Sequence, residues 1–259
     1  PPRSTLFPYT TLFRSLFTFT PTKESLPLYE AKMMHQFDHR WATYCDDGST
    51  RDVTLFEKQD VLYEVRPRYW VEKREVLAKL ADVPKAVVRA WLSGEEIQLR
   101  KELKGCTADN ELSSLSNSDE LFAKMDMIMD KRSPKWLMGW RDICRSTDER
   151  TVIASVIPRR AVGNKFPLLQ FNCCYSNQIY ALLFGDFNSI PHDFVARQKI
   201  GGITLNFFIF KQIPVVSPEK YTKNDITFLL PRILKLVYTS NSMKPWAEEL
   251  GYHGDPFLF

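Results

Sequence analysis

The stretch from residue 134 to residue 214 constrains the fold more than any other part of this chain. It contains three short runs rich in β-branched and aromatic residues, and Pro158, Gly163 and Pro167 interrupt them. Runs of this length and composition, separated by Pro and Gly, predict a meander of strands. The three runs are residues 136–143, 151–157 and 166–172.

Helical spacing follows the strand-like runs. Residues 177–190 repeat apolar side chains at the interval of one helix face, and residues 194–199 predict a second helix that Gly201 and Gly202 end. Strands followed by helices, without regular alternation, are typical of α+β domains. We therefore expect an α+β fold in which helices close a strand meander.

The same stretch is basic. The whole chain has 35 Lys and Arg against 31 Asp and Glu, and a net charge of +4. Within residues 134–214 the basic residues outnumber the acidic ones two to one, which permits a polyanionic partner without requiring one. The basic residues are Lys135, Arg141, Arg145, Arg150, Arg159, Arg160, Lys165, Arg197, Lys199 and Lys211, and the acidic ones are Asp142, Asp148, Glu149, Asp186 and Asp193.

The rest of the chain predicts a different organisation on each side of this stretch. On the N-terminal side, residues 26–65 are strand-like, and residues 72–81 and 85–92 have helical spacing. Residues 105–119 have the composition of an exposed insertion, and a short helix is expected after them at 121–128. After Pro214 the chain turns helical, with a capping box at Thr222 and Asp225, Pro231 in a first helical turn and Pro245 opening a last helix. We expect parts at 26–133 and 134–250, with a truncated tail at 251–259.

The first fifteen residues form a separate case. Residues 5–15 read TLFPYTTLFRS, which resembles the translation of a short-read sequencing adaptor. The alternative is a genuine strand rich in Thr and Phe. We expect residues 1–15 to be a non-native addition outside the fold. The chain begins with Pro1 rather than Met, so we expect a fragment.

Several classes of protein are excluded. No apolar stretch approaches the roughly 20 residues of a membrane helix; the nearest is 205–210. The five cysteines are odd in number and lack C-x-x-C spacing, so we expect reduced thiols, a soluble cytoplasmic protein and no membrane partner. Cys173 and Cys174 are expected to be buried small residues rather than a catalytic thiol. No G-x-S-x-G, phosphate-binding loop or G-x-G-x-x-G occurs, so no catalytic residue is expected.

One histidine pair resembles a metal motif. His35, Asp38 and His39 have the H-x-x-acid-H form of an inverted zinc protease motif. The flanking Phe37 and Trp41 favour a strand over the helix that this motif needs, and no third ligand is evident. We expect no metal here, and a structural or polar role for both histidines.

Arginines between residues 141 and 150 are the first candidate functional residues. Arg141, Arg145 and Arg150 lie in a polar run that fits neither a helix stripe nor strand alternation. In one interpretation they are solvated and pair with nearby acids. In the other they donate hydrogen bonds to phosphates or guanine edges, for which the planar guanidinium is suited.

Two further basic turns follow. Asn164 and Lys165 lie in a flexible turn, and Arg197, Gln198 and Lys199 precede a pair of glycines. Glycine allows the backbone to approach a phosphate closely. These turns are candidates for the same surface as the arginines.

Several ordered blocks together resemble the C-terminal part of large bacterial adenine-specific DNA methyltransferases. In the type II members of that family, modification and sequence recognition share one polypeptide. The resemblance covers about residues 26–250. The blocks are LYEAKMMHQFDHR at 28–40, RDI at 141–143, TDERT at 147–151, VGNK at 162–165, and RQKIGG at 197–202 leading through LNFF at 205–208 to KQIPV at 211–215.

The resemblance implies a DNA target-recognition domain with a strand meander, closing helices and a helical insertion. It also implies a parent protein that methylates adenine N6 with S-adenosylmethionine, sometimes with cleavage, within a restriction-modification system. The family's Asn-Pro-Pro-Tyr or Asn-Pro-Pro-Phe tetrapeptide and Gly-rich cofactor loop are absent here, so we expect a missing N-terminal methyltransferase domain and no cofactor in this fragment. The expected contacts to double-stranded DNA are Arg40, Arg141, Arg145, Arg150, Asn164, Lys165, Arg197, Gln198, Lys199 and Lys211.

Two functions of different classes stay open. The first is a DNA-reading module. The second is a scaffold of a restriction-modification or phage-defence complex, in which aromatic residues such as Trp136 and Phe208 bury a protein contact. A contiguous basic face built from distant blocks favours the first, and scattered, acid-paired arginines favour the second.

Overall fold

The computed structural model describes residues 16–104, 117–145, 147–171 and 175–259. The adaptor-like residues 1–15, most of the expected insertion and the Cys173–Cys174 pair lie outside them. With 44% helix and 15% strand, the chain has the expected mixed α and β composition. Its described residues divide into two compact units, one within residues 16–17, 27–69 and 135–259 (the larger unit) and one within residues 18–26 and 70–134 (the helical unit).

The larger unit contains a three-stranded antiparallel sheet. Strand β6 (Trp136–Trp140) lies in the middle, between β7 (Ala154–Pro158) and β9 (Leu168–Leu169). Gly139 is required where β9 arrives, because a Cβ there would collide with the carbonyl of Pro167. The three expected strands form one antiparallel sheet, and each is shorter than the apolar run that predicted it. The sheet is not the expected meander, because β9 pairs with β6 on the side away from β7 and does not continue from β7.

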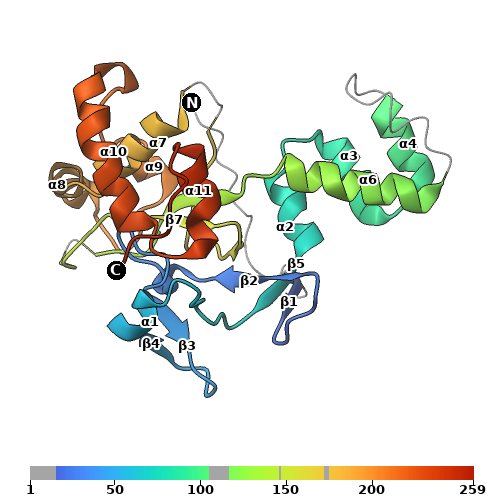
Figure 1. Cartoon of the computed structure of the whole chain (residues 1–259), viewed down its shortest axis with the longest axis horizontal. Coiled ribbons are helices and arrows are strands. Elements are labelled where there is room, and N and C mark those ends of the chain that lie inside the picture. The colour runs from blue at the N-terminus through green and yellow to red at the C-terminus, as the bar shows by residue number, and fades with distance from the viewer. Residues whose placement is uncertain (1–15, 105–116, 146, 172–174) are drawn as a thin grey trace. The chain divides into compact units, whose positions relative to one another are not determined.

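Helices cover this sheet (Figure 1). They are α7 (Asn177–Phe187), α8 (Ile190–Lys199), α9 (Phe207–Phe210), α10 (Lys223–Val237) and α11 (Lys244–Glu249), with short 3-10 turns η3 (Pro218–Lys220) and η4 (Asn241–Met243). Trp140 anchors the core between them: its ring stacks on Phe210 with centroids 3.9 Å apart, and its indole N–H donates to the Leu205 carbonyl at 2.7 Å. That hydrogen bond satisfies the one polar atom of a fully buried side chain.

Residues 27–69 also belong to the larger unit, which differs from the expected boundaries of 26–133 and 134–250. Strand β2 (Ser25–Tyr29) pairs in parallel with β8 (Ala161–Val162), and this long-range pairing joins the two segments. The first of these segments, residues 27–69, continues after β2 with further short elements. They are η2 (Ala31–Met33), the hairpin of β3 (Ala42–Tyr44) and β4 (Thr50–Asp52), and α1 (Leu55–Gln59).

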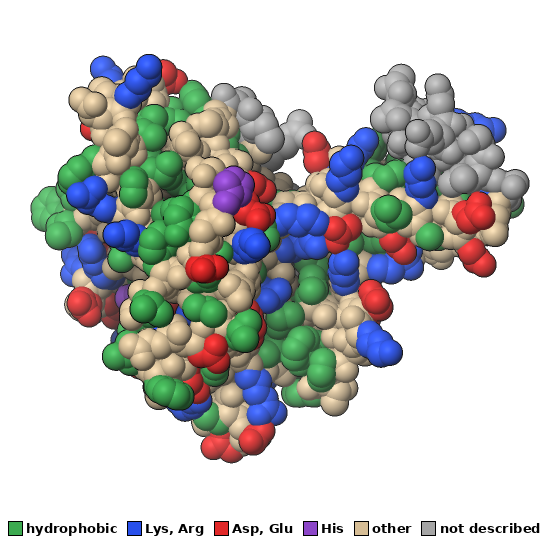
Figure 2. Space-filling model, in the orientation of Figure 1, with side chains coloured by type: hydrophobic (Ala, Val, Ile, Leu, Met, Phe, Trp, Pro, Cys, Tyr) green, Lys and Arg blue, Asp and Glu red, His purple; other side chains and the backbone are tan. Residues whose placement is uncertain are grey.

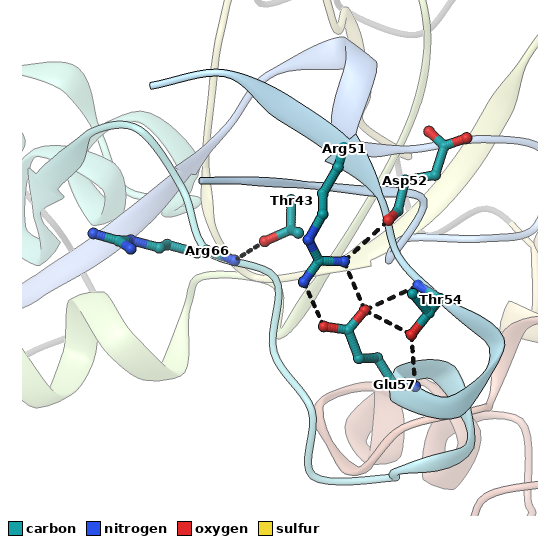
Figure 3. A network of polar contacts seen from close by, with 6 residues as sticks. All are labelled: Thr43, Arg51, Asp52, Thr54, Glu57 and Arg66. Carbon is teal, nitrogen blue, oxygen red and sulfur yellow. Dashed lines mark hydrogen bonds and ion pairs between the residues drawn. The ribbon is translucent and has the colours of Figure 1, made fainter. Parts of the chain in front are cut away.

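The start of α1 shows why the chain turns helical there. Thr54 and Glu57 form a capping box, in which the Thr54 hydroxyl accepts from the Glu57 amide and the Glu57 carboxylate accepts from the Thr54 amide. Arg51 on β4 donates to both oxygens of the same carboxylate, at 2.8 and 2.5 Å (Figure 3). The hairpin is thereby tied to the helix that follows it.

The helical unit contains the expected helical pair. Its elements are β5 (Trp70–Glu72), α2 (Lys73–Leu80), α3 (Lys85–Ser93), α4 (Glu96–Lys104) and α6 (Ser118–Lys131); β1 (Phe17–Thr18) comes earlier in the chain. Trp91 is fully buried in its core, and its indole N–H donates to Asp126 at 2.8 Å. Gly94, with φ of 73°, ends α3 in the left-handed conformation that favours glycine.

The C-terminal helices test the capping signals. The capping box at Thr222 and Asp225 begins α10 as expected, and Pro245 lies in the first turn of α11. Pro231 is in the interior of α10 rather than in a first turn, because the capping box starts the helix two turns earlier. Among the described residues, none of the helices has the length and apolar character needed to cross a membrane.

Candidate nucleic-acid interface

Residues 142–144 lie where the separate basic blocks of the sequence meet. The Asp142 amide donates to the carbonyl of Lys165 at 2.9 Å, and the Asp142 carbonyl accepts from the Leu205 amide at 2.7 Å. The Cys144 amide donates to the carbonyl of Ile203 at 3.1 Å. The arginine-rich segment therefore runs between the Asn164 turn and the chain that follows the glycine pair.

Asp193 brings the third block to the same place. Its Oδ1 accepts from the buried amides of Thr151 and Val152, at 2.8 and 2.7 Å. Its Oδ2 pairs with Arg197 one turn along α8 at 3.2 Å, and Arg197 also donates to the carbonyl of Glu149 at 3.0 Å. The last turn of α8, with its basic residues, is thus fixed beside residues 149–152.

Two of the expected DNA contacts are engaged with acids. Lys165 pairs with Asp142 at 3.1 Å, and Arg197 pairs with Asp193. Both acids are largely buried, so these ion pairs hold the blocks in place more than they present free charge. For these two residues, the structure agrees with the interpretation in which the basic side chains pair with nearby acids.

The other candidates differ in exposure. Arg145, Asn164, Gln198, Lys199 and Lys211 are exposed, while Arg141 and Arg150 are only partly exposed. Lys211 lies over the ring of Phe207 at 5.6 Å, which leaves its ammonium able to meet an anion. Exposed long side chains of this kind are suited to contacts with phosphates.

Arg40 is a correction to the expected surface. Its side chain is fully buried, and its guanidinium donates to the carbonyls of Asp60, Lys58 and Thr239 at 2.7, 2.7 and 2.8 Å. Its backbone amide also binds Asp38, which forms a buried ion pair with Lys58 at 2.5 Å. Arg40 joins distant loops of the core and cannot reach DNA.

A small surface pocket of about 210 Å³ opens beside the arginine segment. Arg141, Arg150, Asp148 and Glu149 line it together with His35 from the turn after η2, and Ile143, Cys144 and Ile153 supply apolar wall. The sequence predicts a structural or polar role for His35 and does not place it beside the arginines. No local signal placed it here, because it joins residues more than a hundred positions away.

Electrostatics in the pocket follow from its partial burial. Burial lowers the pKa of His35, the positive charge of Arg141 lowers it further, and Asp38 and Glu149 oppose this. Burial also lowers the pKa of Arg141, partly offset by Asp148. Burial raises the pKa of the Cys144 thiol to about 11, so this cysteine has no thiolate character at neutral pH.

The two histidines of the H-x-x-acid-H motif lie in different surroundings. Within the described ranges, no group of three or more His, Cys, Asp and Glu residues could hold a metal ion. His39 is fully buried, burial lowers its pKa to about 3, and its Nε2 lies 2.9 Å from the hydroxyl of the equally buried Ser240. Its Nδ1 has no partner among the described residues, so no acid orients it as in a catalytic triad.

Apolar side chains are exposed near the basic ones. Phe208 is 76% exposed, Phe194 63%, Ile203 61% and Ile143 50%. Figure 2 shows one face of the molecule, on which Lys and Arg are interspersed with Asp and Glu over the described surface rather than gathered in one wide patch. On this face, basic, acidic and apolar side chains therefore lie side by side.

Comparison with known proteins adds no relative. The chain matches no protein-family model, and no curated protein matches it in sequence.

Proposed function

We propose that the larger unit binds duplex DNA through the surface around residues 142–144, named here the convergence surface. One observation carries this proposal: basic blocks that lie far apart in the sequence meet along one segment. Asp142 and Cys144 hold the Lys165 turn and the chain after the glycine pair, and Asp193 fixes α8 beside residues 149–152 of the same segment. Basic residues gathered from distant blocks onto one rigid framework are what a DNA-binding protein needs to neutralise successive phosphates.

The acid-paired cations and the exposed ones have different roles in this proposal. Arg197 and Lys165 hold the framework through buried acids. Arg145, Lys199 and Lys211 are exposed and meet the phosphates. A surface with only a few such contacts binds DNA modestly and with strong salt dependence, because each phosphate neutralised releases bound counterions.

The wider role rests on the sequence resemblance. We propose that DNA recognition here serves adenine N6 methylation with S-adenosylmethionine in a cytoplasmic restriction-modification system. The printed sequence has no Asn-Pro-Pro-Tyr or Asn-Pro-Pro-Phe tetrapeptide. We therefore expect no methyl transfer from labelled S-adenosylmethionine to duplex DNA by this chain alone, and methylated adenine above background would contradict the proposed division of roles.

Duplex binding is tested by fluorescence anisotropy over a range of salt concentrations. The triple variant Arg145→Ala, Lys199→Ala, Lys211→Ala removes three exposed positive charges from the larger unit. The slope of log affinity against log salt should flatten by about 0.9 for each side chain that meets a phosphate. The matched control Lys85→Ala, Arg89→Ala, Lys101→Ala removes three exposed charges from the helical unit and should leave the slope unchanged.

A second candidate is a protein-docking scaffold, which the exposed Phe194, Ile203 and Phe208 favour. Large apolar side chains that cluster on a surface mark protein interaction sites. In that case Phe208→Ser would abolish partner binding. The triple charge variant would then have the same affinity for DNA as the wild type. An unchanged salt slope in the triple variant decides for the scaffold.

A further inference from the structure

The pocket beside Arg141 contains a partly buried cation that has no hydrogen-bond acceptor among the described residues. Arg141 is only partly exposed, and its guanidinium makes no hydrogen bond to any of the described residues. A desolvated charge that lacks acceptors is costly to maintain. Burial accordingly lowers the pKa of this side chain, and Asp148 offsets the effect only in part. The guanidinium is placed to receive an anionic acceptor.

The charges that line the pocket define what that acceptor can be. Arg141 and Arg150 carry two positive charges, and Asp148 and Glu149 carry two negative ones. His35 adds a positive charge only when it is protonated. A ligand with one negative charge is therefore balanced by one proton on His35, whereas a dianion leaves an uncompensated charge in a partly buried site.

The size and shape of the pocket narrow the choice further. At about 210 Å³ it is smaller than the roughly 300–1,000 Å³ of sites for drug-sized ligands. A base edge lies recessed in a groove and is read by side chains that project into it. A partly buried arginine in a hollow does not project in this way, but it can meet a group that stands out from the DNA backbone.

We propose that this pocket seats one phosphodiester group of the DNA backbone, with the guanidinium of Arg141 donating hydrogen bonds to its oxygens. The inference rests on the proposed function in taking DNA as the source of that group. A phosphodiester carries a single negative charge and only acceptor atoms at its phosphoryl oxygens, which matches the empty donor positions and the charge balance. Arg141 is then a phosphate contact and not a reader of bases.

Seating the phosphodiester is coupled to proton uptake by His35. The charged groups that act on this ring are Arg141 and Lys58, which disfavour its protonation, and Asp38 and Glu149, which favour it. The ring of Trp41 packs against it, with centroids 4.4 Å apart and the two planes tilted by 32°. A bound anion favours the protonated ring, so the pKa of His35 is higher in the complex than in the free protein. Binding is therefore strongest at low pH and weakens as the pH rises through the pKa of the complex.

The direct test uses the chain with isotope-labelled histidine and dimethyl phosphate as the probe. NMR titration follows the four histidines separately. Dimethyl phosphate should raise the pKa of His35 and should leave the resonances of the exposed His253 in place. Arg141→Ala should abolish the response, and Arg141→Lys should keep part of it. No response in the wild type, or an equal response in Arg141→Ala, would overturn the assignment of this pocket.

Duplex binding supplies the second arm. Arg141→Ala should flatten the salt slope by about one and weaken binding equally on all sequences, and Arg89→Ala is the matched control with one exposed arginine removed from the helical unit. If Arg141→Ala instead relaxes the preference for one base pair, Arg141 reads a base and the proposal fails. A wild type that binds dimethyl phosphate but no duplex refutes the proposed function and leaves the pocket intact.

Discussion

Asp193 is the side chain on which the convergence surface depends, and replacing it gives the sharpest prediction. Its carboxylate is nearly buried, and Oδ1 accepts two hydrogen bonds from the amides of Thr151 and Val152, both of which are fully buried. Asp193→Ala leaves these two donors without an acceptor in a space too small to be rebuilt easily. A buried donor left unsatisfied costs about 1 to 3 kcal/mol.

The two donors together give an expected loss of about 3 kcal/mol in the free energy of unfolding of the larger unit. For a domain of this size, each kcal/mol corresponds to roughly 2 to 4 °C in melting temperature. Urea denaturation followed by circular dichroism measures the loss. The matched control is Asp193→Asn, which keeps an acceptor oxygen for both amides and loses only the charge that pairs with Arg197, so its cost should be about 1 kcal/mol.

The variant also has a functional consequence. Without the carboxylate, α8 loses its hydrogen bonds to the amides of Thr151 and Val152 and its ion pair with Arg197, although Arg197 can still donate to the Glu149 carbonyl. Duplex binding should therefore weaken together with stability. If Asp193→Ala unfolds at the same urea concentration as the wild type, the amides have found other partners. The hydrogen bonds of Asp193 then do not hold the surface together.

Three further substitutions test the framework of the larger unit. Arg40→Met removes donors from the carbonyls of Lys58, Thr239 and Asp60, the first two of which are in buried hydrogen bonds, and should cost about 3 kcal/mol in urea denaturation; a cost below 1 kcal/mol would contradict its structural role. Gly139→Ala brings a Cβ against the carbonyl of Pro167 and should cost about 1 to 3 kcal/mol, whereas wild-type stability would show that β9 can move aside. His39 has a pKa of about 3 in the folded chain and an ordinary pKa near 6.5 when unfolded, so it contributes stability above pH 6.5 that is lost as the pH falls. His39→Gln should remove up to about 1 kcal/mol per pH unit of that dependence between pH 6 and 4, and an unchanged pH profile would refute the assignment.

Local signals account for the elements that the sequence predicts correctly. The capping box at Thr222, the apolar stripe of α7 and the Pro-broken strands β6 and β7 depend on neighbours within a few residues. Helix α4 was not expected, because its surface is mostly charged and only Leu99 and Leu103 are buried. Two apolar positions in nine residues do not distinguish a helix from a polar loop.

Features that depend on distant contacts could not be predicted from the sequence. Arg40 lies in a block that resembles a DNA-binding family, and nothing near it in the sequence indicates that Thr239 and Asp60 supply carbonyls for its guanidinium. His35 likewise reaches the Arg141 pocket only through tertiary structure. The basic blocks themselves were evident from charge, but their meeting at Asp142 depends on backbone hydrogen bonds between segments 23 and 63 residues apart in sequence.

Hydrogen exchange with and without saturating duplex DNA tests the convergence surface most directly. If the three blocks form one DNA-binding surface, duplex should slow amide exchange together around Arg145, around Lys165 and around Lys199, and should leave helices α3 and α4 unchanged. Protection confined to one block, or found only in the helical unit, would contradict a surface built from all three.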